Sequence, residues 1–116
     1  VGLAFMNGLT PVELYNPSID EYIEPSFANA LKALPAYLAD PGANLMNSEL
    51  EGAYPIARLL YYLVHKSNLG WHVLVYLNWV LTRGQIFISN VGYVPINGTS
   101  AIIYSLNLVS LLNPTS

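Results

Sequence analysis

The run IARLLYYLVH, residues Ile56–His65, constrains the fold more than any other part of the chain. It is almost continuously apolar, holds the single charge of Arg58, and follows Tyr54-Pro55. A short apolar run without a polar face is typical of a strand buried on both faces. Periodicity alone does not separate this strand from a buried helix. The run is too short to span a bilayer, which takes about 20 apolar residues.

The whole chain, like this run, is rich in apolar residues and poor in charged ones. Hydrophobic residues make up 53% and charged residues 9% of 116, whereas an ordinary soluble domain is about 25% charged. The longest apolar run, Trp71–Leu81, is interrupted by His72 and Asn78. The sequence therefore predicts a chain whose apolar faces are covered by something else. With no signal peptide in view, Val1 indicates a processed end, a fragment boundary or the first traceable residue.

Two further strands are predicted near the N-terminus. Val1–Phe5 is a short apolar run that ends at the turn signal Asn7-Gly8. Thr10–Tyr15 is a weaker candidate that is stopped by Asn16-Pro17.

Three helices are predicted from capping residues and helical spacing. The first follows Glu24-Pro25-Ser26 and carries apolar residues to Leu34. The second covers Trp71–Thr82, after which Gly84 is a C-cap or a kink, and Gly92–Pro95 is a loop. The third begins at Thr99 or Ser100 and ends near Asn113-Pro114. The order of strands and helices predicts an α/β fold with too few strands, about three, to close a sheet of the usual size.

Several functional classes lack the residues that their chemistry needs. A net charge of −3 with four cations argues against nucleic-acid binding. Cysteine is absent, and His65 and His72 lack metal-ligand spacing. The carboxylates of Asp20, Glu21 and Glu24, and those of Glu49 and Glu51, have no neighbour that would tune one of them for acid–base work. We expect no catalytic site, metal or cofactor.

The aromatic residues and one sequon indicate surfaces rather than chemistry. A core and interface role is favoured over a carbohydrate platform for Tyr54, Tyr61, Tyr62, Trp71, Tyr76 and Trp79. Asn97-Gly98-Thr99 is an N-glycosylation sequon, so Asn97 is a candidate glycosylation site. Many Tyr, Asn, Ser and Thr with little charge favour an extracellular or cell-envelope protein.

Five short motifs follow one another in a fixed order. They are Val1-Gly2-Leu3-Ala4-Phe5, then Glu24-Pro25-Ser26, then Ala53-Tyr54-Pro55-Ile56, then the run NWVLTRGQ from Asn78 to Gln85, and finally Gly92-Tyr93-Val94-Pro95-Ile96. This succession resembles the C-terminal third of the phosphate-binding proteins of ABC transporters, the PstS-like branch of the periplasmic binding proteins. The residues that carry the resemblance are Pro25, Tyr54, Pro55, Asn78, Trp79, Gly84, Gln85, Gly92, Tyr93 and Pro95.

The resemblance implies a partial lobe of a periplasmic-binding-protein-like fold, covering residues 1–116 as a single segment. The family binds phosphate mainly through a Ser-Gly-Thr loop in its first two thirds, and no such loop occurs here. We therefore expect no ligand-binding residue in this chain and phosphate or a similar anion only in the complete protein. The expected partners are the N-terminal part of the same protein or copies of this chain, with an ABC permease beyond them. The alternative is a structural subunit that self-assembles on the cell surface.

Overall fold

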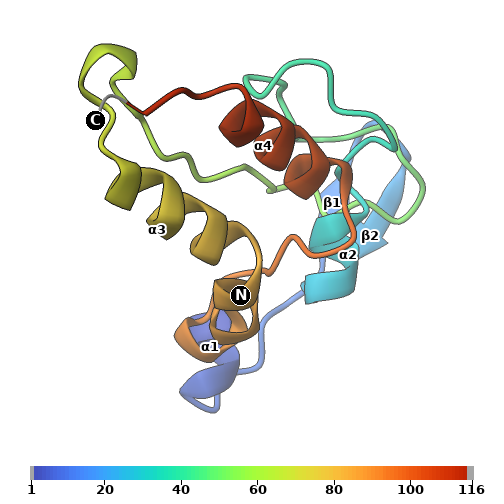
Figure 1. Cartoon of the computed structure of the whole chain (residues 1–116). Helices are drawn as coiled ribbons and strands as arrows, with labels where there is room; N and C mark the ends of the chain where they lie inside the picture. The colour runs from blue at the N-terminus through green and yellow to red at the C-terminus, as the bar shows by residue number, and fades with distance from the viewer. Residues whose placement is uncertain (1, 115–116) are drawn as a thin grey trace.

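The computed structural model describes residues 2–114, which form a small mixed domain that is mostly helical with little strand (Figure 1). The described part holds four α-helices, one two-stranded sheet and three 3-10 helices. The regular elements are α1 (Gly2–Met6), β1 (Leu14–Asn16), β2 (Glu21–Ile23), α2 (Phe27–Leu31), α3 (Trp71–Leu81) and α4 (Ser100–Ser110). The 3-10 helices are η1 (Lys66–Asn68), η2 (Arg83–Phe87) and η3 (Ser89–Val91).

The two strands form an antiparallel hairpin that begins inside the predicted second strand. Leu14 pairs with Ile23 and Asn16 pairs with Glu21. Asn16-Pro17 stops β1, as the sequence predicts, and the chain turns back through Asp20, which has φ of +56°. Aspartate tolerates this left-handed conformation better than most residues.

The three predicted helices are confirmed, and each ends earlier than expected, α3 by a single residue at Leu81. In α2, the Oγ of Ser26 accepts a hydrogen bond from the backbone N–H of Asn29 at 3.1 Å, which is the expected N-cap. This helix ends at Leu31 instead of Leu34. In α4, Thr99 is the N-cap, and the helix ends at Ser110 rather than near Asn113-Pro114. The helix α3 packs against α4.

The predicted strand at Val1–Phe5 is wrong over the part that the structure describes, because Gly2–Met6 is helical. Val1 itself lies outside the described residues. A strand needs a neighbour for its hydrogen bonds, whereas this segment satisfies them locally. The backbone N–H of Asn7 donates to Leu3 and Ala4, and its side-chain amide donates to Leu3 at 2.8 Å.

The predicted strand at Ile56–His65 is also wrong, and so is the helix that its periodicity left open. The segment has no regular secondary structure. It crosses the molecule as the long yellow-green trace that leads to η1 (Figure 1). A sheet needs a second strand beside it, and among residues 2–114 the paired strands are β1 and β2. The described part therefore has two short strands, not about three.

The molecule leaves far more surface in contact with solvent than a closed domain of its size. Its solvent-accessible area is 8074 Å², whereas a folded monomer of 12.7 kDa has about 6,200 Å². The Cα radius of gyration is 16.1 Å, against about 13.4 Å for a compact domain of this length. The main buried cluster consists of three residues, Ala33, Leu45 and Ala53. The apolar side chains of this chain are thus only partly covered by the chain itself.

Candidate interaction surface

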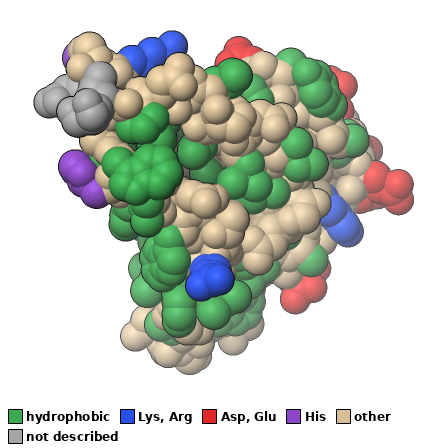
Figure 2. All heavy atoms as spheres, viewed as in Figure 1, with side chains coloured by type: hydrophobic (Ala, Val, Ile, Leu, Met, Phe, Trp, Pro, Cys, Tyr) green, Lys and Arg blue, Asp and Glu red, His purple; other side chains and the backbone are tan. Residues whose placement is uncertain are grey.

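The most unusual feature of the molecule is the number of large hydrophobic side chains that are exposed to solvent. In the described part, ten hydrophobic side chains are buried, and twenty-six large ones are exposed. Leu63 is 97% exposed, Leu111 is 76% exposed and Trp71 is 68% exposed. Single exposed hydrophobic residues are ordinary, but contiguous exposed patches of this kind mark interaction surfaces. Figure 2 shows these side chains spread over the face that includes α3 and α1.

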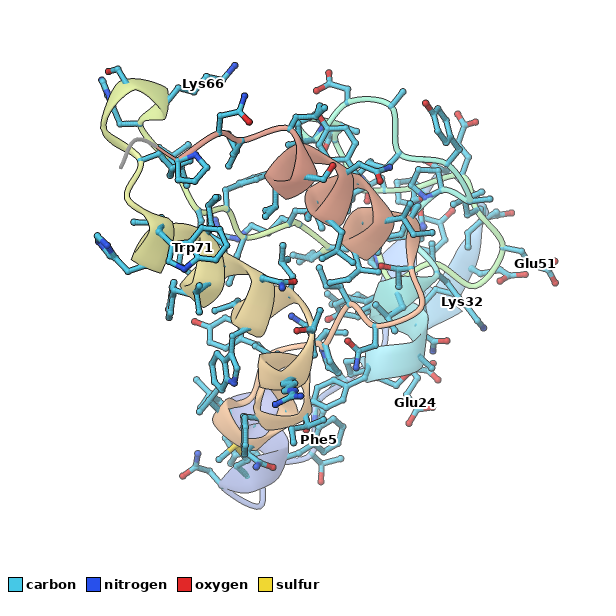
Figure 3. All side chains as sticks on the ribbon, in the orientation of Figure 1. Phe5, Glu24, Lys32, Glu51, Lys66 and Trp71 are labelled. Carbon is cyan, nitrogen blue, oxygen red and sulfur yellow. The ribbon has the colours of Figure 1, made fainter. Side chains whose placement is uncertain are left out.

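Charges divide the molecule into two sides. All seven acids lie between Glu13 and Glu51, and no Asp or Glu follows to the end of the sequence. The cations after that point are Arg58, Lys66 and Arg83. In Figure 3, Glu24, Lys32 and Glu51 lie on the side of the molecule opposite Lys66 and Trp71. The elements from η1 to α4 consequently carry no carboxylate, and their charged side chains are those of Lys66 and Arg83.

Two open depressions are lined mostly by apolar side chains. One has a volume of about 530 Å³ and is lined by residues 42–46, 57–61 and Leu63. The other has a volume of about 560 Å³ and lies between α3 and α4, with Trp71, Trp79 and Arg83 on its walls. The rings of Trp79 and Phe87 stack with their centroids 6.2 Å apart. Neither depression gathers polar groups in the manner of a small-molecule site, where a few polar side chains converge within an enclosed apolar cavity.

The motif Ala53-Tyr54-Pro55 is the main junction between the N-terminal elements and the rest of the chain. All three residues are buried. The N–H of Tyr54 donates to the carbonyl of Asn29 in α2 at 3.0 Å, and the carbonyl of Pro55 accepts from the N–H of Asn47 at 2.8 Å. The Ala53-Tyr54-Pro55 motif therefore has an architectural role in the chain.

Asn16 in β1 connects the hairpin to the same junction by hydrogen bonds to Ser48 and Ala53. Its side chain is completely buried. The Nδ2 atom donates to the carbonyls of Ser48 at 2.9 Å and Ala53 at 3.0 Å, and the Oδ1 atom accepts from the N–H of Ser18 at 3.0 Å. Sequence reasoning used Asn16 only as a strand stop. Its turn-forming side chain before a proline gave no signal of the two long-range bonds.

Gln85 performs a similar role within the run from Asn78 to Ile96. It is almost fully buried, its Nε2 donates to the carbonyl of Val80 at 2.9 Å, and its Oε1 accepts from the N–H of Ile96 at 2.9 Å. The glutamine thus joins the end of α3 to the loop after Gly92. The side chain of Gln85 thus connects Val80, near the start of the run, to Ile96 at its end.

Two glycines, Gly84 and Gly92, lie where the chain turns within this run. The predicted C-cap or kink at Gly84 is a 3-10 helix, since α3 ends at Leu81 and η2 follows. A Cβ at Gly84 would lie 3.0 Å from the ring of Trp79. Gly92 has φ of +84° and ends η3 in the left-handed conformation.

The remaining signature residues divide between core and surface. Pro25 is buried and Pro95 is half-buried, whereas Asn78 and Tyr93 are exposed. Asn78 and Trp79 line the open depression between α3 and α4.

Three tyrosines have a pKa raised above its usual range. A hydrogen bond to Asp20 at 2.5 Å raises the pKa of Tyr15. A hydrogen bond to Tyr76, with the two hydroxyl oxygens 3.2 Å apart, raises the pKa of Tyr62, and burial raises the pKa of Tyr54. All three shifts keep the phenol neutral, so none activates a base or a nucleophile.

The other candidate residues are not brought together. His65 bonds Ser67 at 2.9 Å, and His72 is exposed on α3. Within residues 2–114, no three His, Asp or Glu side chains gather as a metal site. No helix of that range has the length and apolarity needed to cross a membrane. Asn97 is exposed on a turn beside Gly98, which has φ of +72°.

No protein-family model, curated protein or solved structure matches the chain. The family resemblance therefore stays a prediction that rests on the five motifs.

Proposed function

We propose that this chain is the C-terminal segment of a solute-binding protein of the phosphate-binding type and that it supplies lobe packing and hinge structure. The observation that carries the proposal is the surplus of solvent-accessible area, 8074 Å² against about 6,200 Å² for a closed monomer. The excess of about 1,900 Å² exceeds the roughly 800 Å² that each partner buries in a standard interface. This excess area lies in the range that a chain buries in an obligate assembly.

The chemistry of this surface supports a packing role. The face around α3 is apolar and lacks carboxylates, and the depressions on it are open. The signature residues Tyr54, Pro55 and Gln85 are buried within the chain and join its elements. In such a protein the ligand is phosphate or a similar anion, bound by groups on the remainder of the polypeptide. Two lobes close on it by a hinge motion before delivery to a membrane permease. The proposed location is extracellular or in the cell envelope, and we assign no enzymatic step.

Titration calorimetry with inorganic phosphate tests this function. The isolated chain is expected to show no saturable binding, and the complete native protein is expected to bind. Sulfate at the same ionic strength serves as the matched anion control. Saturable phosphate binding by the isolated chain, or none by the complete protein, would refute the proposal. The intact mass of the native polypeptide identifies which of the two forms is being titrated.

A structural subunit that assembles with copies of itself is the second candidate. The long apolar run at Ile56–Val64, exposed along much of its length, favours it, because an unpaired apolar segment is a template for pairing with another chain. Analytical ultracentrifugation separates the two functions. Growth into polymers by the complete native protein, without phosphate binding, would favour assembly.

A further inference from the structure

One exposed asparagine occupies a turn without serving it through its side chain. The side chain of Asn97 is exposed and forms no hydrogen bond with any described residue. Asparagine is common in turns because its amide bonds the nearby backbone or because it tolerates a left-handed conformation. Both uses occur in this chain, since Asn44 accepts from the N–H of Met46 at 3.0 Å and Asn47 has φ of +49°. Neither use applies to Asn97, whose φ is not positive.

The turn that holds Asn97 depends on the neighbouring residues instead. The N–H of Thr99 donates to the carbonyl of Ile96 at 3.2 Å, and Gly98 has φ of +72°. This is a type II turn, in which the third residue needs the left-handed conformation and the second residue does not. The Oγ1 of Thr99 also donates to the carbonyl of Ile96, at 2.7 Å. The turn therefore accounts for Gly98 and Thr99 but not for Asn97.

The turn is fixed at both of its ends. The N–H of Ile96 donates to the Oε1 of Gln85 at 2.9 Å. The Oγ of Ser100, at the start of α4, donates to the carbonyl of Pro35 at 2.6 Å. The space beside the turn is open, because a Cβ added to Gly98 would meet no heavy atom within 4 Å. The turn thus presents its exposed amide on a held support with room for a bulky group.

The residues that follow Asn97 give this position a chemical meaning. Asn-x-Ser or Asn-x-Thr, where x is not Pro, is the acceptor sequence for N-linked glycosylation. The spacing occurs three times in the chain, but the middle residue is proline after Asn16 and after Asn113. Asn16 is in addition completely buried and hydrogen-bonded. Asn97 combines an allowed middle residue, an exposed amide and no competing hydrogen bond.

We propose that Asn97 carries an N-linked oligosaccharide, transferred from a lipid-linked donor by an oligosaccharyl transferase. In the transfer, the electron pair of the Asn97 amide nitrogen forms a bond to the anomeric carbon of an oligosaccharide carried on a lipid phosphate. The bond between that carbon and the phosphate oxygen breaks, and its electron pair stays on the departing lipid phosphate. One of the two amide protons passes to a base of the transferase. The inference rests on the extracellular or cell-envelope location in the proposed function and is independent of the phosphate ligand.

The position of the turn determines the side of the molecule on which the glycan lies. The chain enters α4 beside α2 (Figure 1), in agreement with the bond between Ser100 and Pro35. Glu24 lies on this side of the molecule, opposite Trp71 at the start of α3 (Figure 3). A glycan at Asn97 therefore projects from the charged side and leaves the exposed apolar side chains of α3 accessible to a partner.

Mass spectrometry of the native protein tests the inference. Chymotrypsin cleaves after Tyr93 and Tyr104 and releases the peptide 94–104, in which Asn97 is the single asparagine. We expect most copies of this peptide to carry sugar residues, read from the peptide mass and its fragment ions. Asn90 is the internal control, because it is exposed but has no Ser or Thr two positions later. A peptide 94–104 found only in its unmodified form would overturn the inference, and so would equal modification of Asn90.

A matched pair of variants, produced in the natural host, separates the sequon from the turn. Thr99→Ser keeps the hydroxyl and the sequon, whereas Asn97→Gln removes the acceptor and keeps an exposed amide. Because Asn97 forms no side-chain bond with a described residue, circular dichroism is expected to match the parent in both. Thr99→Ser is expected to retain the glycan and Asn97→Gln to lose it completely. Sugar retained in Asn97→Gln, or lost equally in both variants, would contradict the assignment.

The outcomes for the glycan and for the proposed function are distinguishable. Cell fractionation reports the location, and phosphate titration reports the ligand. An unmodified peptide from a protein recovered outside the cytoplasm would refute the glycan alone. An unmodified peptide from a cytoplasmic protein would refute the proposed location as well. A glycosylated protein that binds no phosphate would support the glycan and refute the proposed ligand.

Discussion

The substitution Asn16→Asp isolates the contribution of one buried amide with almost no change in shape. The carboxylate keeps an oxygen to accept from the N–H of Ser18 but loses the Nδ2 donor. That donor bonds the carbonyls of Ser48 and Ala53 at 2.9 and 3.0 Å, and the side chain is completely buried. After the change, an oxygen faces two carbonyl oxygens, one buried and one part-buried, while the side chain itself has no contact with solvent.

The magnitude follows from those two bonds. Leaving a buried hydrogen-bonding group without its partner costs about 1–3 kcal/mol. For two carbonyls, the expected loss is about 2–5 kcal/mol of unfolding free energy, a large part of the 5–15 kcal/mol of an ordinary domain. Burial raises the pKa of the new carboxyl above its unfolded value of about 3.9. The protonated form donates one hydrogen bond, so the deficit is smaller at low pH and grows as pH rises through the folded pKa.

Urea unfolding monitored by circular dichroism, at about pH 4 and pH 7, measures this effect. Asn90→Asp is the matched control, because Asn90 is exposed and its side chain forms no hydrogen bond with any described residue. The control is expected to stay within about 0.5 kcal/mol of the parent. If Asn16→Asp costs no more than Asn90→Asp at pH 7, or if its deficit does not change with pH, the role assigned to the buried amide is wrong.

Three other outcomes follow from the same structure. Gln85→Glu keeps the acceptor for the N–H of Ile96 but loses the donor to Val80. We expect a loss of about 1–3 kcal/mol in urea unfolding, and an unchanged midpoint would contradict this. Gly92→Ala at φ of +84° is expected to cost about 1–2 kcal/mol of left-handed strain plus a 3.1 Å contact with Leu3. Gly98→Ala at φ of +72° in open space reports the strain alone, so equal losses would show that the contact is unimportant. Burial raises the pKa of Tyr54 above 10.0. Its contribution to stability is therefore present below about pH 10 and is lost as pH rises through the folded pKa. Thermal unfolding of Tyr54→Phe is expected to show a weaker loss of stability above pH 10, and an unchanged alkaline slope would oppose this.

Local signals predicted the local elements well. Ser26 capped the first predicted helix, and the leucine spacing of α3 gave its extent within one residue. These elements satisfy most of their backbone groups within themselves, so the information needed to form them is contained in a few neighbouring residues.

The strand predicted at Ile56–His65 is absent from the structure for the opposite reason. Its apolar pattern is that of a strand, but a ladder is a property of two segments, and the described chain supplies no second one. The α-helix at Gly2–Met6 formed where a strand was expected because its hydrogen bonds close locally. Among the buried amides, neither Asn16 nor Gln85 gave any sequence sign of its partners, which lie up to 37 residues away. In the sequence, every acidic residue lies between Glu13 and Glu51. This uneven distribution is the signal that could have located the apolar face.

The exposed apolar run at Ile56–Val64 also has a consequence for synthesis. Polypeptides emerge from the ribosome with their N-terminal part first. On the function proposed above, the remainder of the lobe is already present when Ile56–Val64 emerges, and the apolar run is exposed only briefly. Made on its own, the same segment has no waiting partner and is exposed from the moment of release. If the proposed function is right, the yield of soluble chain is expected to rise on co-expression with the remainder of that protein, and an unchanged yield would oppose it.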